Sequence, residues 1–500
     1  MSDSSHSEKR NEKPDSYDNH AEIAVSEIDT GAQLAAESVE AVDPAEALRI
    51  RRTENRQKYL ANDVLVQFMD KTTLAYAAIL GIEQEAHLTV DQYNWLGTIF
   101  YLSYLVFEYP QNLALQRFPV GKWMSINIFV WSVALCSHAA CKSFGGLFVA
   151  RFVLGICEGS ITAGFMIVSS MFYTRTEQTL RVGYWFLMNG TAQIILAFVA
   201  YGTLHITNSK LEPWQWLMII TGLLTLILSV CFWLFFPDSP TNAWFLTPKE
   251  RVIAIQRIKG NQTGVENKHF KKEQLIELLW EPKTWLFFIF SVADNIPNSL
   301  TNQGTLIITS FGFTTLQTTL LGCVAGVIEI VTIWSGVVIS ARIPNSRAFV
   351  ASAYFLPSLL GIFLLNLLPW IFIVSVISLA WVSATTAGHT KKVTMNAVML
   401  CGYCIGNALG PFMWQEKYKP RNHVPWITIG CCFVVSIILL MIIRINLAAE
   451  NRRRDAEPSD TRYDNVYVEL MRDGSIEKVK VEKEFLDLTD TQNREFRYVL

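Results

Sequence analysis

The sequence predicts an all-α polytopic membrane protein with twelve transmembrane helices in two six-helix halves. Its 500 residues are 51% hydrophobic and only 17% charged, and the apolar residues gather in long segments between polar ends. A segment of about 20 mostly apolar residues can cross a bilayer as a helix. Two blocks of six such segments are separated by one longer polar stretch, residues 237–283, and this spacing predicts the two halves.

Both ends of the chain are polar. Residues 1–58 are rich in Ser, Glu, Asp and Ala and cannot bury a core, so they are predicted to form a disordered cytosolic tail. Residues 447–500 are charged and are predicted to form a second cytosolic tail. No secretory signal pattern opens the sequence, so we expect membrane insertion to rely on the first spanning helix.

The first half, residues 59–236, carries ionisable residues inside its apolar segments. Asp70 and Lys71 lie near the middle of the first span, and Glu108 lies in the second. Successive side chains on a helix point about 100° apart, so Asp70 and Lys71 need separate partners or one shared polar cavity. The six predicted spans are approximately residues 59–80, 93–115, 124–141, 147–172, 182–206 and 216–236.

The fourth span contains two full charges, Arg151 and Glu158. Seven residues along a helix return to nearly the same face, about 10 Å farther along the axis. A charge at membrane depth costs roughly 2.5 kcal/mol or more unless it faces a partner or water. Both charges are therefore predicted to face one shared interior space, beside Gly155, Gly159 and Gly164. The alternative is a buried Arg–Glu pair that only fixes the packing.

The polar stretch 237–283 mixes charges with apolar residues at helical spacing, which predicts surface helices on the cytosolic side. Thr247 followed by Pro248 is a helix-start pattern, with Thr as the N-cap. The second half, residues 284–446, has a similar series of apolar segments. Its six predicted spans are approximately residues 284–311, 315–339, 348–368, 370–388, 393–414 and 426–446.

The seventh span is unusually polar for a membrane helix. Pro297 is expected to bend it. Asn295, Asn298 and Asn302 fall on one face of the helix. Such a row of amides can orient a substrate, or it can hold neighbouring helices together by hydrogen bonds.

Other ionisable residues leave both a structural and a functional role open. Glu108, Asp294 and Glu329 each lie within an apolar segment and need a partner there. His389 stands beside two lysines at the end of a predicted span. Contact with lipid headgroups or a loop is expected of it, rather than a part in proton transfer.

Basic residues in short loops predict the orientation of the chain, because cytosolic loops are enriched in Lys and Arg. The basic loops fall on the same side as both termini, so both termini are expected to be cytosolic. These residues are Arg117, Lys122, Arg175, Arg181, Arg342, Arg347, Lys391 and Lys392.

Composition excludes several functional classes. A net charge of −2 gives no reason to expect a nucleic-acid partner. The nine cysteines lie in or beside apolar segments and are expected to be small buried hydrophobes, with no metal site or cofactor. Cys401 and Cys404 have CxxC spacing but no further ligands nearby. No hydrolase, zinc-protease or phosphate-loop motif occurs, so no catalytic residues and no enzymatic activity are predicted.

Several motifs together resemble the major facilitator superfamily, and within it the fungal allantoate permease family of anion:cation symporters. The resemblance covers roughly residues 59–446 and continues into the C-terminal tail. The superfamily usually has an Asp in the loop between the second and third spans, where this chain has Gln116, so no charge-relay role is expected of that loop. The motifs are FMDKTT at 68–73, YPQN at 109–112, RFVLGICEG at 151–159, AGHTKK at 387–392, GYCIGNALGP at 402–411 and DLTDTQNREFRYVL at 487–500.

The resemblance implies a major facilitator fold and secondary active transport by alternating access. It implies import of a small organic anion, such as allantoate, a dipeptide or a related carboxylate, driven by the proton gradient. Permeases for vitamins and carboxylates (nicotinate, pantothenate, biotin) or for sulfur compounds are alternatives within the same family. The protein is expected to be monomeric in the bilayer of the plasma membrane, with the vacuolar and endoplasmic reticulum membranes as alternatives.

The predicted site follows from the charges inside the spans. Arg151 suits a carboxylate because a guanidinium makes bidentate hydrogen bonds. Lys71 is predicted to add a second positive charge, with Asp70 as its counter-ion. Glu158 and Asp70 are predicted to couple transport to protons. The remaining predicted substrate contacts are Asn298, Asn302 and Tyr403.

Two other functions remain open at this stage. A nutrient sensor with a transporter fold would bind its ligand without moving it. A facilitative uniporter would move the same substrate without protons. Saturable uptake would reject the sensor, and loss of proton coupling would indicate the uniporter.

Overall fold

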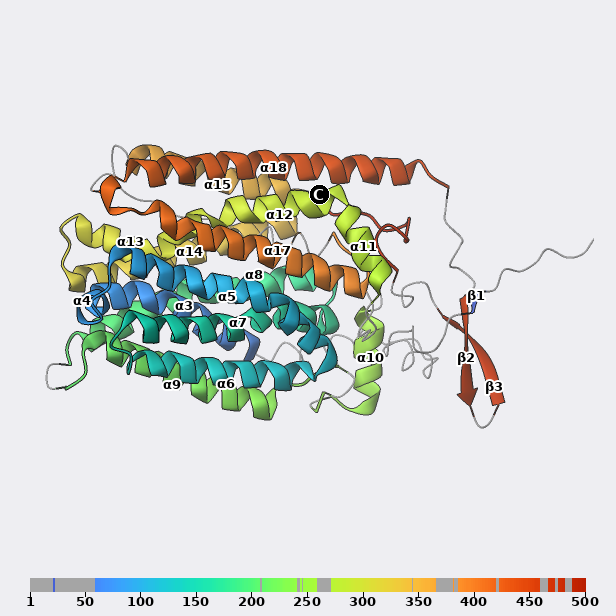
Figure 1. The fold of residues 1–500 in the computed structure, drawn as a ribbon. Helices are drawn as coiled ribbons and strands as arrows, with labels where there is room; N and C mark the ends of the chain where they lie inside the picture. The colour runs from blue at the N-terminus through green and yellow to red at the C-terminus, as the bar shows by residue number, and fades with distance from the viewer. Residues whose placement is uncertain are drawn as a thin grey trace, which may run out of the picture.

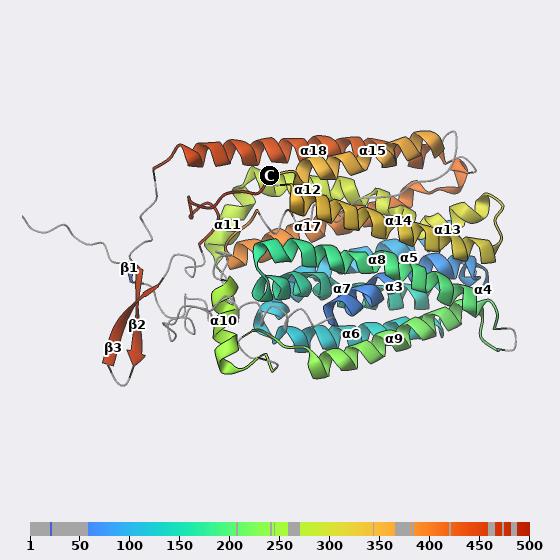
Figure 2. The same cartoon turned by 180° about the vertical axis from the view of Figure 1, so that it is seen from behind.

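The structure is a computed structural model in which long helices run side by side (Figures 1 and 2). The helices of both halves lie roughly parallel or antiparallel to one another, and two short helices lie across one end. We call that end the linker end, and the opposite end, where the short helix α4 lies, the α4 end. The structure describes residues 21–22, 59–206, 209–240, 243–244, 246–258, 271–343, 345–365, 381, 385–419, 422–458, 466–472, 475–481 and 488–500.

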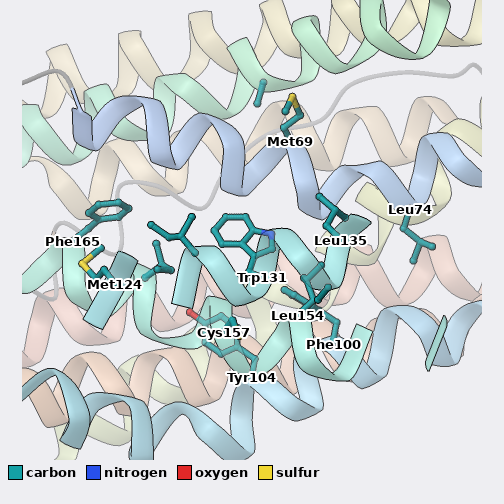
Figure 3. Close-up of a cluster of buried hydrophobic side chains, with 14 of the residues drawn as sticks. Met69, Leu74, Phe100, Tyr104, Met124, Trp131, Leu135, Leu154, Cys157 and Phe165 are labelled. Carbon is teal, nitrogen blue, oxygen red and sulfur yellow. The ribbon is translucent and has the colours of Figure 1, made fainter. Parts of the chain in front are cut away.

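The first half has a helix at each of its six predicted spans. Its core includes Trp131 and Leu154, which are fully buried, and Figure 3 shows them among sulfur-containing and aromatic side chains. The helices are α3 (Tyr59–Ile79), α4 (Ile82–Glu85), α5 (Val90–Arg117), α6 (Val120–His138), α7 (Phe144–Phe172), α8 (Arg175–Thr203) and α9 (Pro213–Phe235).

The polar stretch between the halves forms α10 (Pro248–Ile258) and α11 (Lys272–Trp280). The helix α10 begins at Pro248, as the Thr247–Pro248 pattern predicts. Thr247 and Glu250 cap it reciprocally, since the amide of Thr247 donates to the Glu250 carboxylate and the amide of Glu250 donates to the Thr247 hydroxyl.

The second half begins with a broken helix. The first part ends at Asn295, and a 3₁₀ turn over Pro297–Ser299 precedes the next part, as Pro297 predicts. Most of the predicted tenth span, 370–388, lies outside the described residues. The helices are α12 (Pro282–Asn295), α13 (Leu300–Ser310), α14 (Thr315–Arg342), α15 (Arg347–Leu365), α17 (His389–Leu409) and α18 (His423–Asp455), with 3₁₀ turns at Gly410–Met413 and Glu416–Tyr418.

Among the described helices, 7 are long and apolar enough to cross a membrane, namely α6, α7, α8, α9, α14, α17 and α18. Several helices outside this group carry polar residues. The helix α3 contains Asp70 and Lys71, α5 contains Glu108, and Pro297 divides α12 from α13. The polar residues themselves lower the hydropathy of these helices.

The two halves meet along α8 and α14, where two glycines face each other. A Cβ atom added to Gly190 would lie 2.5 Å from the carbonyl oxygen of Gly326, and one added to Gly326 would lie 2.6 Å from that of Gly190. The absence of both side chains therefore lets the two backbones touch.

At the α4 end, hydrogen bonds close the contact between the halves. The hydroxyl of Tyr93 donates to the carbonyl of Asn302 at 3.1 Å. The amide of Asn94 donates to the carbonyl of Trp414 at 3.1 Å, and the hydroxyl of Thr305 donates to the carbonyl of Ala75 at 2.8 Å. The halves are therefore joined by polar contacts at this end.

The chain ends add structure that the all-α prediction did not include. The strand β1 (Ala21–Glu22) pairs in parallel with β2 (Val466–Arg472), which pairs antiparallel with β3 (Ser475–Val481). This small sheet lies beyond the linker end (Figure 1). In addition, α18 continues to Asp455, past the predicted end of its span, and residues 488–500 return to the helices.

The contact between α5 and α7 predicts a strong effect of one added methyl group. In Gly155→Ala, the new Cβ would lie 2.1 Å from the Ser103 hydroxyl and 2.2 Å from the carbonyl oxygen of Phe100. Because that carbonyl belongs to the backbone, we expect a loss of about 1–3 kcal/mol or more of stability. The measurement is the melting temperature of the purified protein. Gly145→Ala in the same helix is the control, since no atom lies within 4 Å of its new Cβ. Equal melting temperatures for the two variants would contradict this packing.

Candidate functional site

Lys71 lies in the middle of α3 and forms an ion pair with Glu158 of α7. Its Nζ atom is 3.1 Å from Oε2 of Glu158. The Glu158 side chain is fully buried and that of Lys71 is 15% exposed. Removing either charge would leave the other buried without a partner. The predicted pairing of Lys71 with Asp70 is therefore wrong, because adjacent side chains diverge on the helix.

Aromatic rings from both halves surround the ammonium group of Lys71. Its Nζ atom is 5.9 Å from the ring centroids of Phe100 and Tyr104 on α5, and 5.8 Å from that of Tyr403 on α17. The Tyr101 ring meets the Tyr403 ring edge-on at 5.7 Å. Such faces attract a cation. Tyr403 of the second half, which the sequence analysis named as a substrate contact, therefore lies beside the ammonium group of Lys71.

Asp70 points away from Lys71 and toward α9. The hydroxyl of Thr225 donates to Oδ2 of Asp70 at 2.7 Å. The carboxylate is fully buried, and its Oδ1 accepts no hydrogen bond from the described residues. Asp70 also interacts electrostatically with Glu158 and Arg151, so it belongs to the same charged group without touching Lys71.

Arg151 lies two helical turns from Glu158, nearer the α4 end. It is 3% exposed, and among the described residues its Nε and Nη2 atoms donate no hydrogen bond. Its electrostatic interactions with Glu158 and Asp70 agree with the predicted shared interior. The direct ionic partner of Glu158, however, is Lys71. The alternative of a packing pair between Arg151 and Glu158 is therefore wrong.

The two predicted asparagines lie nearer the α4 end. The amide of Asn298 donates to the Asn407 side chain of α17 at 2.7 Å, which is a contact between helices of the second half. The backbone carbonyl of Asn302 accepts from Tyr93, and its side-chain nitrogen lies against Gly97 of α5. The described contacts of both residues therefore belong to helix packing, and neither contacts Lys71.

Glu108 and Glu329 each accept a hydrogen bond from a neighbouring amide side chain. The Glu108 carboxylate accepts from Asn112 at 2.9 Å and lies against Gly159, beside the Lys71–Glu158 pair. Glu329 accepts from Gln193 at 2.7 Å, across the contact between α14 and α8. The side chain of His389 lies outside the described part of the chain. Within the described ranges, no three His, Cys, Asp or Glu side chains gather as a metal site requires.

Sequence reasoning missed the aromatic residues around Lys71 and the partner of Asp70. Tyr104 follows Phe100 by four positions and Tyr101 by three, and these spacings place residues on one helix face, which is a signal that could have been used. Thr225 carries no such signal, since a single threonine in an apolar span is common.

The chain is similar in sequence to known transporters. A sequence profile of the Major Facilitator Superfamily matches residues 64–411. The allantoate permease of Saccharomyces cerevisiae is 31% identical, with 95% of this chain and 90% of the relative covered. The thiamine pathway transporter of that yeast is 32% identical (88% and 84% covered), and its high affinity cysteine transporter is 30% identical (87% of each covered).

A solved structure has the same arrangement of helices. The xylose transporter XylE from E. coli, in an inward open conformation, matches with a TM-score of 0.55. The match covers 77% of this chain and 95% of that one at 12% sequence identity, so it bears on the fold alone.

Removing one charge of the Lys71–Glu158 pair should destabilise the protein, and removing both should restore much of the loss. We expect Lys71→Met and Glu158→Gln each to cost about 3–5 kcal/mol, because each leaves a buried group without its partner. The double variant should cost less than either single variant. Melting temperatures of the purified proteins at pH 7 make the comparison. A double variant less stable than both single variants would contradict the pairing.

Proposed function

The chain belongs to the Major Facilitator Superfamily and is a membrane transporter rather than an enzyme, and on this premise we propose that it imports a small organic anion together with protons. The observation that carries the proposal is the buried ion pair between Lys71 and Glu158, inside rings from both halves. A group at the junction of the two halves can respond to a substrate and to their relative movement together.

Positive charge supports the choice of an anion. Arg151 is a buried guanidinium with two hydrogen-bond donors that no described residue satisfies. A carboxylate can accept from both in a bidentate arrangement. Lys71 is the second cation, and its side chain is 15% exposed. An anion bound between them would replace Glu158 as the partner of Lys71.

The same exchange supplies the coupling to protons. If the substrate forms an ion pair with Lys71, Glu158 is left as a negative charge in a fully buried position. An isolated buried carboxylate is costly, and protonation removes that charge. Binding of the anion therefore favours binding of a proton at Glu158. Asp70 is a second carboxylate that can share this role, because it interacts with Glu158 and Arg151.

The aromatic rings support a small substrate with an apolar or planar body. Phe100, Tyr104 and Tyr403 offer ring faces beside the positive charges. The named relatives include an allantoate permease and a cysteine transporter. Allantoate and cysteine are both compounds with a carboxylate group. We therefore favour allantoate, a dipeptide or a related carboxylate, with vitamin or sulfur-containing acids as the next candidates.

Import into the cell also requires a defined orientation of the chain in the membrane. We place both termini in the cytosol and the protein, as a monomer, in the plasma membrane. The α4 end then faces outward, and its hydrogen bonds between the halves close the outer side. In this arrangement the halves would rock about α8 and α14, and the linker end would open to the cytosol.

Uptake by a transport-deficient yeast tests the proposal. Labelled allantoate, a dipeptide, nicotinate, pantothenate, biotin and cysteine are supplied at pH 5 and pH 7, with and without an uncoupler. We expect one acid to accumulate more at pH 5 and its accumulation to collapse with the uncoupler. Uptake that the uncoupler leaves unchanged would indicate a uniporter. Binding without accumulation, by protein confirmed at the cell surface, would indicate a sensor.

Two substitutions test separately the residue proposed to bind the anion and the residue proposed to bind the proton. Arg151→Ala should reduce uptake about 30-fold or more at normal surface expression, because it removes a buried charge that binds the substrate. Glu158→Gln should abolish accumulation driven by the proton gradient but retain exchange of labelled for unlabelled substrate. Lys142→Ala, at an exposed lysine of the α4 end, is the control. Normal uptake by Arg151→Ala would reject the anion site.

A further inference from the structure

Residues 488–500, which we call the clasp segment, lie at the linker end against α11, α12, α17 and α18 (Figures 1 and 2). The segment is rich in polar residues, yet its central side chains are buried. Asp490 is 0% exposed, Phe496 1% and Tyr498 5%. Burial of a carboxylate requires ionic or hydrogen-bond partners, and these identify what the segment holds together.

Asp490 joins two spanning helices. Its carboxylate pairs with Lys283 of α12, and it also pairs with Lys391 of α17 at 3.0 Å. The hydroxyl of Tyr498 donates to the same carboxylate at 2.6 Å. Burial opposes ionisation, but the two ammonium groups outweigh it and hold the pKa of Asp490 below its ordinary value of 3.8. Because a lowered pKa contributes stability that is lost only in acid, Asp490 holds the segment throughout the neutral range.

The same network reaches the linker helix α11. Lys391 pairs with Glu277 at 2.7 Å and with Glu281, which follows the last residue of α11. The hydroxyl of Thr489 donates to Glu277 at 2.9 Å. The lysine of α17, the acidic residues of the linker and the clasp segment therefore form one connected group of charges.

A second set of bonds ties the segment to α18. Arg454 is 2% exposed, and its Nη1 atom donates to the carbonyls of Asp490 and Phe496, both at 2.9 Å. Asn451 exchanges two hydrogen bonds with the backbone of Tyr498, at 2.8 and 2.9 Å. The indole of Trp381 donates to the carbonyl of Val499 at 2.6 Å.

We propose that the clasp segment fastens α11 to the linker-end termini of α12, α17 and α18, so that this part of the linker moves with the second half as one rigid body. Each bond given above goes to α11 or to the second half, and none goes to the first half. A segment that blocked transport would have to bridge the halves. The observed bonds instead stiffen one half and leave the relative movement of the halves free.

The charges also show that the segment can be released without unfolding the helices. Without Asp490, Lys283 still has Glu281 at 3.1 Å, and Lys391 still has Glu277. Arg454 still has Glu450 at 3.0 Å. A variant that frees the segment therefore leaves no buried lysine without a carboxylate and is expected to fold.

Hydrogen–deuterium exchange of the full-length protein in lipid nanodiscs tests the proposal. Residues 488–500 and 272–280 should both be protected in the unaltered protein. In Asp490→Asn, exchange should rise on the order of 100-fold in 488–500, because one partner of a buried ion pair is removed. It should rise by a smaller factor in 272–280, since Lys391 still pairs with Glu277 of α11. Tyr498→Phe keeps the ring but loses the hydroxyl, so it should produce a smaller rise in the same two segments. Arg497→Ala is the control, since its pair with Asp455 is 42% and 65% exposed and should matter little.

Two results would overturn the proposal. One is rapid exchange of residues 488–500 in the unaltered protein, and the other is loss of protection there in Asp490→Asn with no change in 272–280. Uptake adds a readout that rests on the proposed function: Asp490→Asn should lower the maximal rate and leave the half-saturation concentration unchanged. A changed half-saturation concentration would place the segment in the transport pathway and overturn the proposal. The exchange result does not depend on whether the proposed substrate is right.

Discussion

The ion pair between Lys71 and Glu158 is the constraint on which the arrangement of the first half depends. Two charges in an apolar interior must meet each other, so α3 and α7 are fixed in rotation and in register. Once Lys71 turns to α7, the neighbouring Asp70 must turn elsewhere, and it meets Thr225 of α9. The glycine at 155 brings α5 close to α7, and α5 in turn supplies aromatic rings beside the lysine. One pair thereby positions four helices.

The protein contains a second group of buried charges, and the contrast between the two groups is informative. At the linker end, both oxygens of Asp490 have partners, namely Lys391 on one side and Lys283 with Tyr498 on the other. In the middle of the first half, Arg151 and Asp70 keep polar atoms that no described residue satisfies. A carboxylate with partners at both oxygens favours one fixed arrangement, whereas a polar group without partners retains capacity for a ligand or a proton. The first is suited to holding helices together, and the second agrees with the binding role that we propose for Arg151 and Asp70.

Much of the fold could be predicted from the sequence because hydrophobic length, Pro and capping residues act locally. The break at Pro297 and the start of α10 after Thr247 follow from such local rules. The ionic partner of Lys71 could not be predicted, because it depends on how separate helices rotate against each other. The clasp segment was missed for another reason. Its charges predict exposure to solvent, but Asp490 is neutralised by lysines that precede it by 207 and 99 positions in the chain. The roles assigned to Asn298 and Asn302 remain predictions, since their described contacts lie between helices.

The glycine contact between α8 and α14 has a consequence for how such a protein diversifies. Because Gly190 and Gly326 bring backbone against backbone, the spacing of the halves at this point is set by atoms that every amino-acid sequence shares. Exchange of the rings around Lys71 for other side chains would then reshape the proposed binding region without moving the helices apart at this contact. Selection can thus change substrate specificity and the packing between the two halves as nearly separate traits.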